Sequence, residues 1–314
     1  GYMRGNTVAI KVCSCRSLTR KTVSDYIREA RILASFSHRN VMKLLGCCIV
    51  PPSVWIVTEY CKRGNLYDVV RSLSRNATAK QHHKHAVPSA TSSLLAESSA
   101  RPLSDWNLRL YLMLGAAYGL EHIHSKMFIH GDIKPDNFIV TEDWVVKLAD
   151  FGEAKEEGTN MKVDLSARGK DKKRILRGEG AGTIIWLAPE RLGPLYSLFL
   201  DIDGLAKPIS HRSDISQAAD MYSFGLTLWE IAVGERPFAS MDTYTAGLAV
   251  LQRDARPSLE AIPSTKFITL LKSCWARDPR NRLDSKEIVM MLETLNNGWK
   301  PTGYQNLHQE SNRG

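Results

Sequence analysis

Three oxygen-bearing side chains and one ammonium group lie close together in the middle of the chain. Asp132, Lys134 and Asn137 belong to the stretch His-Gly-Asp-Ile-Lys-Pro-Asp-Asn, and Asp150 begins the triplet Asp-Phe-Gly. Carboxylate and amide oxygens are hard ligands of the kind that Mg²⁺ takes together with phosphate oxygens. The ammonium group suits a phosphoryl group that carries negative charge. The residue types therefore indicate chemistry on a phosphate.

The segment between these residues predicts a hairpin that brings them together. Residues 138–140 and 144–148 are apolar runs, and the polar residues 141–143 between them suit a turn. The two ends of a hairpin lie side by side. We therefore expect Asn137 and Asp150 to be neighbours, as two ligands of one ion must be.

These motifs resemble those of eukaryotic protein kinases. Residues 130–137 are similar to the catalytic-loop pattern H-R-D-L-x-x-x-N, and residues 150–152 to the metal-binding triplet D-F-G. The resemblance implies that Asp132 orients the substrate hydroxyl and accepts its proton, and that Lys134 neutralises charge on the transferred γ-phosphoryl group. It further implies that Asn137 and Asp150 hold Mg²⁺.

A second part of the resemblance lies near the start of the chain. Residues 8–12, Val-Ala-Ile-Lys-Val, are typical of a strand and resemble the V-A-I-K strand, whose lysine contacts the α- and β-phosphates. Residues 22–36 show the apolar spacing of a helix, with Thr22 opening a capping box. Glu29 shares the apolar face of this helix. Because a buried carboxylate is costly unless it is paired, we expect an ion pair between Glu29 and Lys11.

The nucleotide contacts follow from the resemblance alone. Thr58 would line the back of the nucleotide pocket, and residues 59–61 would form a hinge whose backbone groups pair with adenine. The residues implied in nucleotide binding are Ala9, Lys11, Thr58, Glu59, Cys61 and Ile139. ATP and Mg²⁺ are therefore the expected reaction partners, together with a protein substrate.

The fold class that the resemblance implies is α+β, the bilobal protein-kinase fold. We expect a small, β-rich N-lobe over residues 1–60, a large, mainly helical C-lobe over 61–297, and a tail over 298–314. In kinases a first strand and a Gly-rich loop precede the V-A-I-K strand. Residues 1–7 have room only for the end of a strand and a turn, so we expect both features to be missing from this sequence.

Two segments of the C-lobe are expected to be unusual. Residues 72–102 are rich in Ser, Ala, Thr and His and have few large apolar side chains, which predicts an insertion largely without fixed structure. Residues 150–190 correspond to a long activation segment. It ends in a stretch similar to G-T-x-x-W-x-A-P-E, whose Glu190 would pair with Arg282 in the core.

Two helices of the C-lobe are expected around the catalytic loop. Residues 106–124 are apolar on nearly all sides, which predicts a core helix. Residues 219–230 resemble the buried helix that begins with an aspartate, here Asp220, beneath the catalytic loop.

Composition adds limits on location and partners. The chain has 314 residues, 43% of them apolar, and a net charge of +9. Its basic run at 170–174 has no interleaved aromatic residues, so we expect a solvated loop and no nucleic-acid partner. Six scattered cysteines without zinc spacing suit reduced thiols in a cytoplasmic protein, or in the cytoplasmic domain of a larger one. No apolar run reaches the ~18 residues of a membrane helix, and the oligomeric state is open.

The predicted function is phosphoryl transfer from Mg-ATP to serine or threonine hydroxyls of proteins. Lys134 followed by Pro135 resembles serine/threonine kinases, and residues 44–46, 58–60 and 274–275 resemble the tyrosine-kinase-like branch of them. The alternative is a pseudokinase, a kinase-fold interaction or scaffold module without turnover. The missing Gly-rich loop, the insertions and one departure from the motif favour it, whereas the six retained catalytic side chains favour an enzyme.

That departure is Gly131, which stands where the catalytic-loop pattern has arginine. In kinases the arginine meets a phosphate on the activation segment. We therefore expect that activity does not require phosphorylation of this segment.

Overall fold

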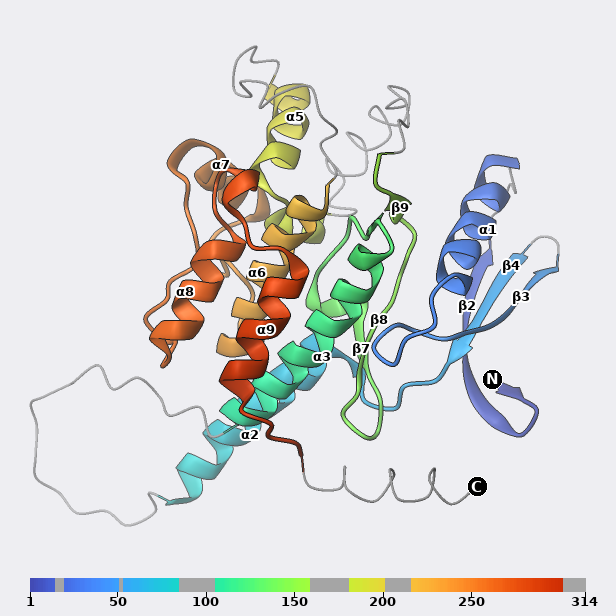
Figure 1. Cartoon of the computed structure of the whole chain (residues 1–314), viewed down its shortest axis with the longest axis horizontal. Helices are drawn as coiled ribbons and strands as arrows, with labels where there is room; N and C mark the ends of the chain where they lie inside the picture. Colours follow the sequence, from blue (N-terminus) through green and yellow to red (C-terminus); the bar gives the residue numbers. More distant parts are fainter. Residues whose placement is uncertain (15–19, 51–52, 85–104, 159–180, 201–215, 302–314) are drawn as a thin grey trace, which may run out of the picture.

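The computed structural model describes residues 1–14, 20–50, 53–84, 105–158, 181–200 and 216–301. Figure 1 shows a small region built on a sheet at one end and a larger, mostly helical region at the other, which confirms the expected α+β fold class. The chain crosses from the small region to the large one directly after the strand that ends at Glu59.

The small region is one antiparallel sheet covered by a helix. The strands are β1 (Tyr2–Met3), β2 (Asn6–Ser14), β3 (Leu44–Val50) and β4 (Ser53–Glu59), in the order β1-β2-β4-β3. Helix α1 (Arg20–Ala34) packs on β3 and β4. It begins two residues before Thr22, so the capping box expected there is wrong. Arg20 and Lys21 are favourable helix residues and extend the first turn.

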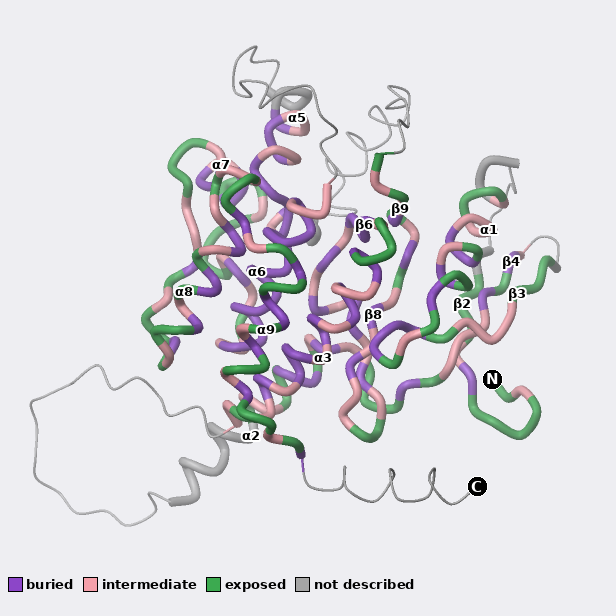
Figure 2. The backbone as a smooth tube through the Cα atoms, in the orientation of Figure 1, coloured by how far each residue is buried: buried purple, intermediate pink, exposed green. Residues whose placement is uncertain are grey.

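The large region is built around two buried helices. Helix α3 (Trp106–Ser125) is buried on most sides, as its continuous apolar sequence predicts, and α6 (Gln217–Val233) is buried along almost its whole length (Figure 2). The helices around them are α2 (Leu66–Lys84), α5 (Pro189–Leu200), α7 (Thr243–Arg253), α8 (Thr265–Cys274) and α9 (Ser285–Asn296). Short 3-10 helices are η1 (Pro135–Asn137), η2 (Ala181–Trp186) and η3 (Pro279–Asn281).

Short strands lie between the sheet of the small region and the helices. Strands β5 (Gly64–Asn65), β7 (Phe138–Val140) and β8 (Val146–Leu148) form one sheet, and β6 (Phe128–Ile129) pairs with β9 (Lys155–Glu156). Strands β7 and β8 are the expected hairpin, with Phe138 opposite Leu148. The hairpin leads the chain directly to Asp150.

The two regions are joined where the connection from α1 to β3 meets β8. The side-chain amide of Asn40 donates to Val146 O over 2.8 Å, and the backbone N–H of Leu148 donates to Asn40 O over 2.8 Å. A β-carbon on Gly119 of α3 would lie only 2.4 Å from Asn40 O, so glycine permits this close approach. The strand that leads to Asp150 is thereby fixed to the connection that follows α1.

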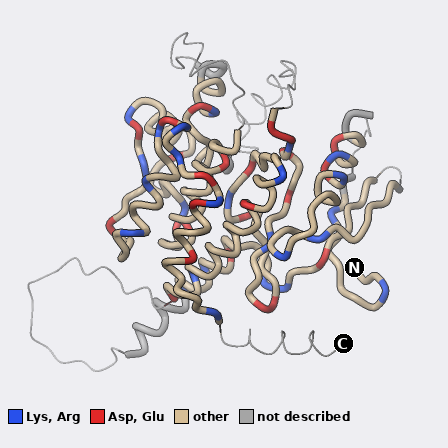
Figure 3. Tube along the Cα trace, in the orientation of Figure 1, with Lys and Arg blue, Asp and Glu red and all other residues tan. Residues whose placement is uncertain are grey.

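A buried ion pair ties the end of the activation segment to the C-terminal helices. Arg282 donates to both carboxylate oxygens of Glu190, over 2.6 and 2.9 Å, and its side chain is fully buried. The expected pair is therefore present. Figure 3 shows that acidic and basic residues are interspersed over the described elements.

One expected irregular segment is partly helical. Helix α2 continues to Lys84, so the first part of the insertion expected at 72–102 is helical; its Ala, Lys and Gln residues are favourable in helices. Residues 85–104, the basic run at 170–174 and residues 159–180 of the activation segment lie outside the described residues. Among the helices that the structure describes, none is long and apolar enough to cross a membrane.

Candidate active site

Asp132 is a carboxylate with one engaged and one unengaged oxygen. Its Oδ2 accepts hydrogen bonds from Lys134 Nζ over 2.7 Å and from Asn137 Nδ2 over 2.9 Å. Its Oδ1 is buried and has no hydrogen-bond partner within the described part of the chain. A buried acceptor without a partner is costly, so Oδ1 has a vacant position for a donor, and 16% of the Asp132 side chain is exposed to solvent.

Asp220, the acid expected at the start of α6, holds the backbone of the catalytic loop. This carboxylate accepts the backbone N–H groups of His130 and Gly131, over 2.7 and 2.9 Å, and lies 3.1 Å from His124 Nε2. Burial alone would raise the pKa of Asp220, but the hydrogen bond and charge of His124 outweigh burial and lower this pKa below its ordinary value. Asp220 is therefore a charged anchor for the loop.

His130 has a packing role in this arrangement. Its Nδ1 accepts the backbone N–H of Asp132 over 3.3 Å, so its Nε2 carries the proton that is donated to Ala149 O over 3.0 Å. Its ring lies 5.1 Å from the ring of Phe151. Both ring nitrogens are thus engaged by the backbone, which leaves neither to act as a base.

Lys11 connects the small region to Asp150. Its Nζ lies 2.8 Å from Glu29 Oε1 and 3.0 Å from Asp150 Oδ1. Burial favours a lower pKa for Lys11, but the hydrogen bond to Glu29 and the charge of Asp150 raise it above its usual value. Burial likewise favours a higher pKa for Asp150, but the charge of Lys11 lowers it. Lys11 and Asp150 are therefore both charged at neutral pH, and the ion pair expected between Lys11 and Glu29 is present.

Asn137 and Asp150 are adjacent across the ends of the hairpin. The backbone N–H of Ala149 donates to Asn137 O over 2.8 Å. The amide Nδ2 of Asn137 donates to Asp132, which leaves its Oδ1 as the atom that can coordinate a cation. The structure describes no group of three or more His, Cys, Asp or Glu residues that could hold a metal ion. One carboxylate and one amide nevertheless fit Mg²⁺, which keeps several waters and binds substrate phosphates.

The residues implied in nucleotide binding lie on β2, on β4 and at the junction of the two regions. Ala9 and Thr58 face each other in register on β2 and β4, and Lys11 is two residues further along β2. The carboxylate of Glu59 is occupied by Lys147, 2.9 Å away, and by the N–H of Lys43. This agrees with a hinge that offers only backbone groups.

The last two implied nucleotide contacts are apolar or neutral. Cys61 is buried just after β4, and burial raises the pKa of its thiol to about 11. Ile139 is half-buried on β7, in register with Lys147 on β8. Neither side chain adds charge to the site.

Comparison with known proteins decides the family. The sequence model described as protein tyrosine and serine/threonine kinase matches residues 2–292. The chain belongs to this family. It is similar to Serine/threonine-protein kinase STY17 of Arabidopsis thaliana, with 28% identity over 92% of this chain and 40% of that protein. It is also similar to Probable serine/threonine-protein kinase drkC of Dictyostelium discoideum, with 30% identity over 94% of this chain and 32% of that protein. The chain thus spans less than half the length of these relatives.

Arginines that contact the catalytic segments of this kinase domain were missed by sequence reasoning. Arg236 donates to both oxygens of Asp136, over 2.8 and 3.0 Å, and its guanidinium lies 3.7 Å from the ring of Tyr67. Arg28 donates to the backbone carbonyls of Gly152 and Ala154. For Arg236, the only signal was an acidic residue within the catalytic-loop motif that needed a partner. For Arg28 there was none, because backbone carbonyls leave no mark in a sequence.

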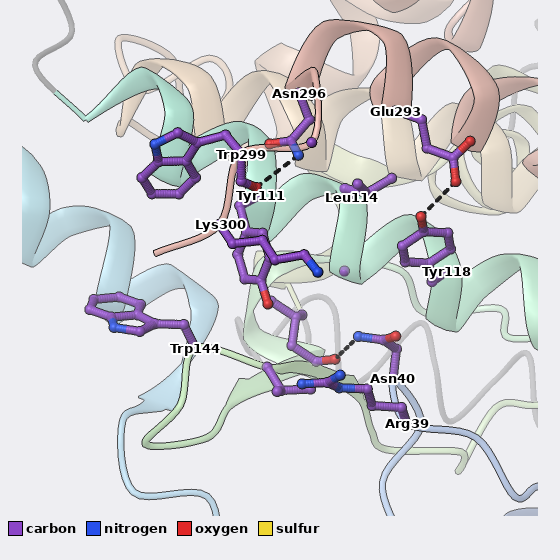
Figure 4. Close-up of a pocket in the computed structure, with 14 residues that line it drawn as sticks. Arg39, Asn40, Tyr111, Leu114, Tyr118, Trp144, Glu293, Asn296, Trp299 and Lys300 are labelled. Atoms are coloured by element: carbon purple, nitrogen blue, oxygen red, sulfur yellow. Dashed lines mark hydrogen bonds between the residues drawn. The ribbon is translucent and has the colours of Figure 1, made fainter. Parts of the chain in front are cut away.

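A cavity of about 420 Å³ lies apart from the catalytic cluster (Figure 4). It is bounded by α3, the end of α9, the turn of the β7–β8 hairpin and the segment after α1. Residues around it include Arg39, Tyr111, Tyr118, Trp144, Glu293 and Lys300. None of the residues expected in catalysis, metal binding or nucleotide binding lines this cavity.

Proposed function

We propose that this chain is the catalytic domain of an ATP-dependent protein serine/threonine kinase. The observation that carries the proposal is the arrangement around Asp132, with Oδ2 held by Lys134 and Asn137 and Oδ1 buried without a partner. A substrate hydroxyl that donates to Oδ1 would be oriented for attack on the γ-phosphorus, and Asp132 would accept its proton.

The neighbouring cations would carry the phosphate charge. Lys134, whose Nζ lies 2.7 Å from Asp132 Oδ2, would neutralise charge on the transferred phosphoryl group. Lys11, braced by Glu29, would contact the α- and β-phosphates of ATP. Phosphoryl transfer depends mainly on positioning and on charge stabilisation, and both lysines are held for that purpose by carboxylates.

Asn137 and Asp150 are the proposed ligands of Mg²⁺. When bound, the metal ion neutralises charge on the phosphates. Asp150 is half-exposed and has a lowered pKa, so its carboxylate is ionised and accessible to a cation. Its φ of +60° is uncommon for a residue other than glycine, and such conformations cluster at functional sites.

Specificity for serine and threonine is supported by the names of the similar proteins from Arabidopsis and Dictyostelium, which are serine/threonine kinases. The retained side chains favour turnover over a scaffold role as a pseudokinase. A cytoplasmic setting is also proposed, because Cys47 and Cys48 are exposed free thiols, which suit a reducing compartment.

The test compares Asp132→Asn with the unsubstituted protein. We expect the rate of ATP-dependent phosphorylation of a random peptide library with one serine or threonine acceptor to fall by about 10²- to 10⁴-fold. The thermal shift produced by ATP with Mg²⁺ should remain. Asp143→Asn, in the exposed turn of the same hairpin, is the matched control and should leave both readouts unchanged.

Two results would contradict the proposal. Equal transfer rates for the unsubstituted protein and Asp132→Asn would remove Asp132 from catalysis. A clear nucleotide-dependent thermal shift without any transfer would instead favour the pseudokinase, an interaction module with the same fold.

A further inference from the structure

Arg28 of α1 binds backbone carbonyls at the end of the Asp-Phe-Gly triplet and shortly after it. Its Nη2 donates to Gly152 O over 2.8 Å, and its Nη1 donates to Ala154 O over 3.0 Å. These contacts join residues 124 and 126 positions apart in the chain. Within the part of the chain that the structure describes, no carboxylate forms an ion pair with Arg28.

The two acceptors are presented by a fixed turn. The N–H of Ala154 donates to Phe151 O over 3.1 Å, and the segment continues into β9, which pairs with β6. The planar guanidinium of arginine offers donors in a rigid fork, which matches two carbonyls that are two residues apart. A lysine could not reach both in this way.

The next residue of α1 binds the same segment through side chains. Glu29 holds Lys11, and Lys11 holds Asp150. Two consecutive residues of α1 therefore hold residues 150–154. Arg28 binds their backbone carbonyls, and Glu29 acts through Lys11 on the side chain of Asp150. The end of α1 has a separate contact, because Phe36 lies 5.4 Å from the ring of Phe151. Without Arg28 the helix could pivot about that contact and withdraw Glu29.

We propose that Arg28 is a positioning residue that keeps α1 docked on the Gly152–Ala154 backbone and thereby keeps the chain Glu29–Lys11–Asp150 assembled. Only the expected effect of Arg28 on catalysis rests on the proposed kinase activity. The acceptors are backbone carbonyls, so this fastening requires no phosphate. It deepens the proposed function by naming what holds the lysine and the metal ligand in register.

The experiment compares Arg28→Ala, Arg28→Lys and Arg31→Ala in the full chain without nucleotide. Arg31 is exposed near the end of the same helix and serves as the matched control. Hydrogen exchange of the amides in residues 23–34 and 151–157 is the first readout, because it does not depend on activity. We expect Arg28→Ala to exchange roughly 10- to 100-fold faster in both segments, as loss of two hydrogen bonds from a charged donor implies.

The second readout is steady-state kinetics with ATP. Arg28→Ala should raise KM for ATP and lower kcat, by roughly tenfold in kcat/KM. Arg28→Lys should be intermediate in both readouts, because an ammonium group on a flexible stem keeps the charge but lacks the rigid, planar fork of donors. Arg31→Ala should match the unsubstituted protein. A role in general stability would instead raise exchange evenly across the protein.

The two proposals can fail separately. If Arg28→Ala leaves exchange in residues 23–34 and 151–157 unchanged, or raises it only together with the rest of the chain, the role of Arg28 is overturned whatever the activity. If exchange rises as expected but the unsubstituted protein transfers no phosphate, the proposed kinase function fails and the fastening by Arg28 stands.

Discussion

Two acidic residues on the same helix, Asp220 and Glu230, show how surroundings decide the chemistry of a side chain. Asp220 accepts two backbone N–H groups and pairs with His124, and its pKa lies below the ordinary value. Glu230 is equally buried, but neither of its carboxylate oxygens has a hydrogen bond within the described residues. Burial raises its pKa to about 8, although Arg236, 3.4 Å away, opposes the shift.

A pH-dependent stability follows for Glu230. In the unfolded chain Glu230 loses its proton near its ordinary pKa of 4.5, but in the folded protein it keeps the proton up to about pH 8. Between these two pH values folding must take up a proton, so the free energy of unfolding falls as the pH rises. Glu230→Gln removes this loss. We expect the melting temperature of the variant, relative to the unsubstituted protein, to increase steadily between about pH 5 and pH 8.

The matched control for Glu230 is Glu260→Gln, because Glu260 is exposed. Its difference in melting temperature should be the same at both ends of that range. A difference for Glu230→Gln that does not change with pH would show that Glu230 is ionised throughout.

At the scale of elements, the connection after α1 and the β7–β8 hairpin act as one joint. Asn40 bonds to β8 through its side chain and its backbone, and β8 leads to Asp150. Helix α3 approaches this joint at Gly119. The position of Asp150, the proposed ligand of Mg²⁺, therefore depends on contacts between three different elements.

Gly119→Ala tests the joint. The added β-carbon would lie 2.4 Å from Asn40 O, a backbone atom that cannot rotate away. We expect a loss of about 1–3 kcal/mol in the free energy of unfolding, measured by denaturant titration. Gly46→Ala on β3 is the control, because its β-carbon would meet no atom within 4 Å. Equal stabilities of the two variants would contradict the close approach.

The beginning of the activation segment packs against Gly131 of the catalytic loop. Gly131 has a φ of +81°, and a β-carbon there would lie 3.1 Å from Glu153 O, so the segment packs where a side chain would interfere. We expect phosphatase treatment to leave the rate of peptide phosphorylation unchanged. A collapse of the rate after treatment would show that a phosphate is needed despite the glycine.

At the scale of the whole molecule, the pair of Glu190 and Arg282 joins the end of the activation segment to the C-terminal helices. Arg282 also donates to Ala218 O over 2.7 Å and to Ala276 O over 2.8 Å. Its guanidinium is therefore satisfied on several sides. Removal of one partner would leave a buried charge without compensation.

Arg282→Met should cost about 3–5 kcal/mol in the free energy of unfolding, measured by urea titration. The comparison variant is Arg280→Met, because the Arg280 side chain is 88% exposed in its ion pair with Asp278. That variant should unfold at the same urea concentration as the unsubstituted protein. Equal midpoints for both variants would mean that the buried pair adds nothing to stability.

The sequence by itself determined the elements whose residues are close along the chain. The apolar runs and the polar turn at residues 138–148 predicted the hairpin and the adjacency of Asn137 and Asp150, because a hairpin is a local structure, whereas the catalytic loop was implied by the resemblance. The continuous apolar run of α3 predicted a core helix for the same reason. The resemblance supplied the distant pairs of Lys11 with Glu29 and of Glu190 with Arg282, which are present.

Only the tertiary structure decided the contacts that involve backbone atoms and burial. The carbonyls bound by Arg28 and the approach of Gly119 to Asn40 have no signature in residue types. The opposite pKa shifts of Asp220 and Glu230 likewise depend on which donors reach each carboxylate. The physical reason is that every residue carries the same carbonyl group, and desolvation depends on neighbours that the fold brings from elsewhere in the chain.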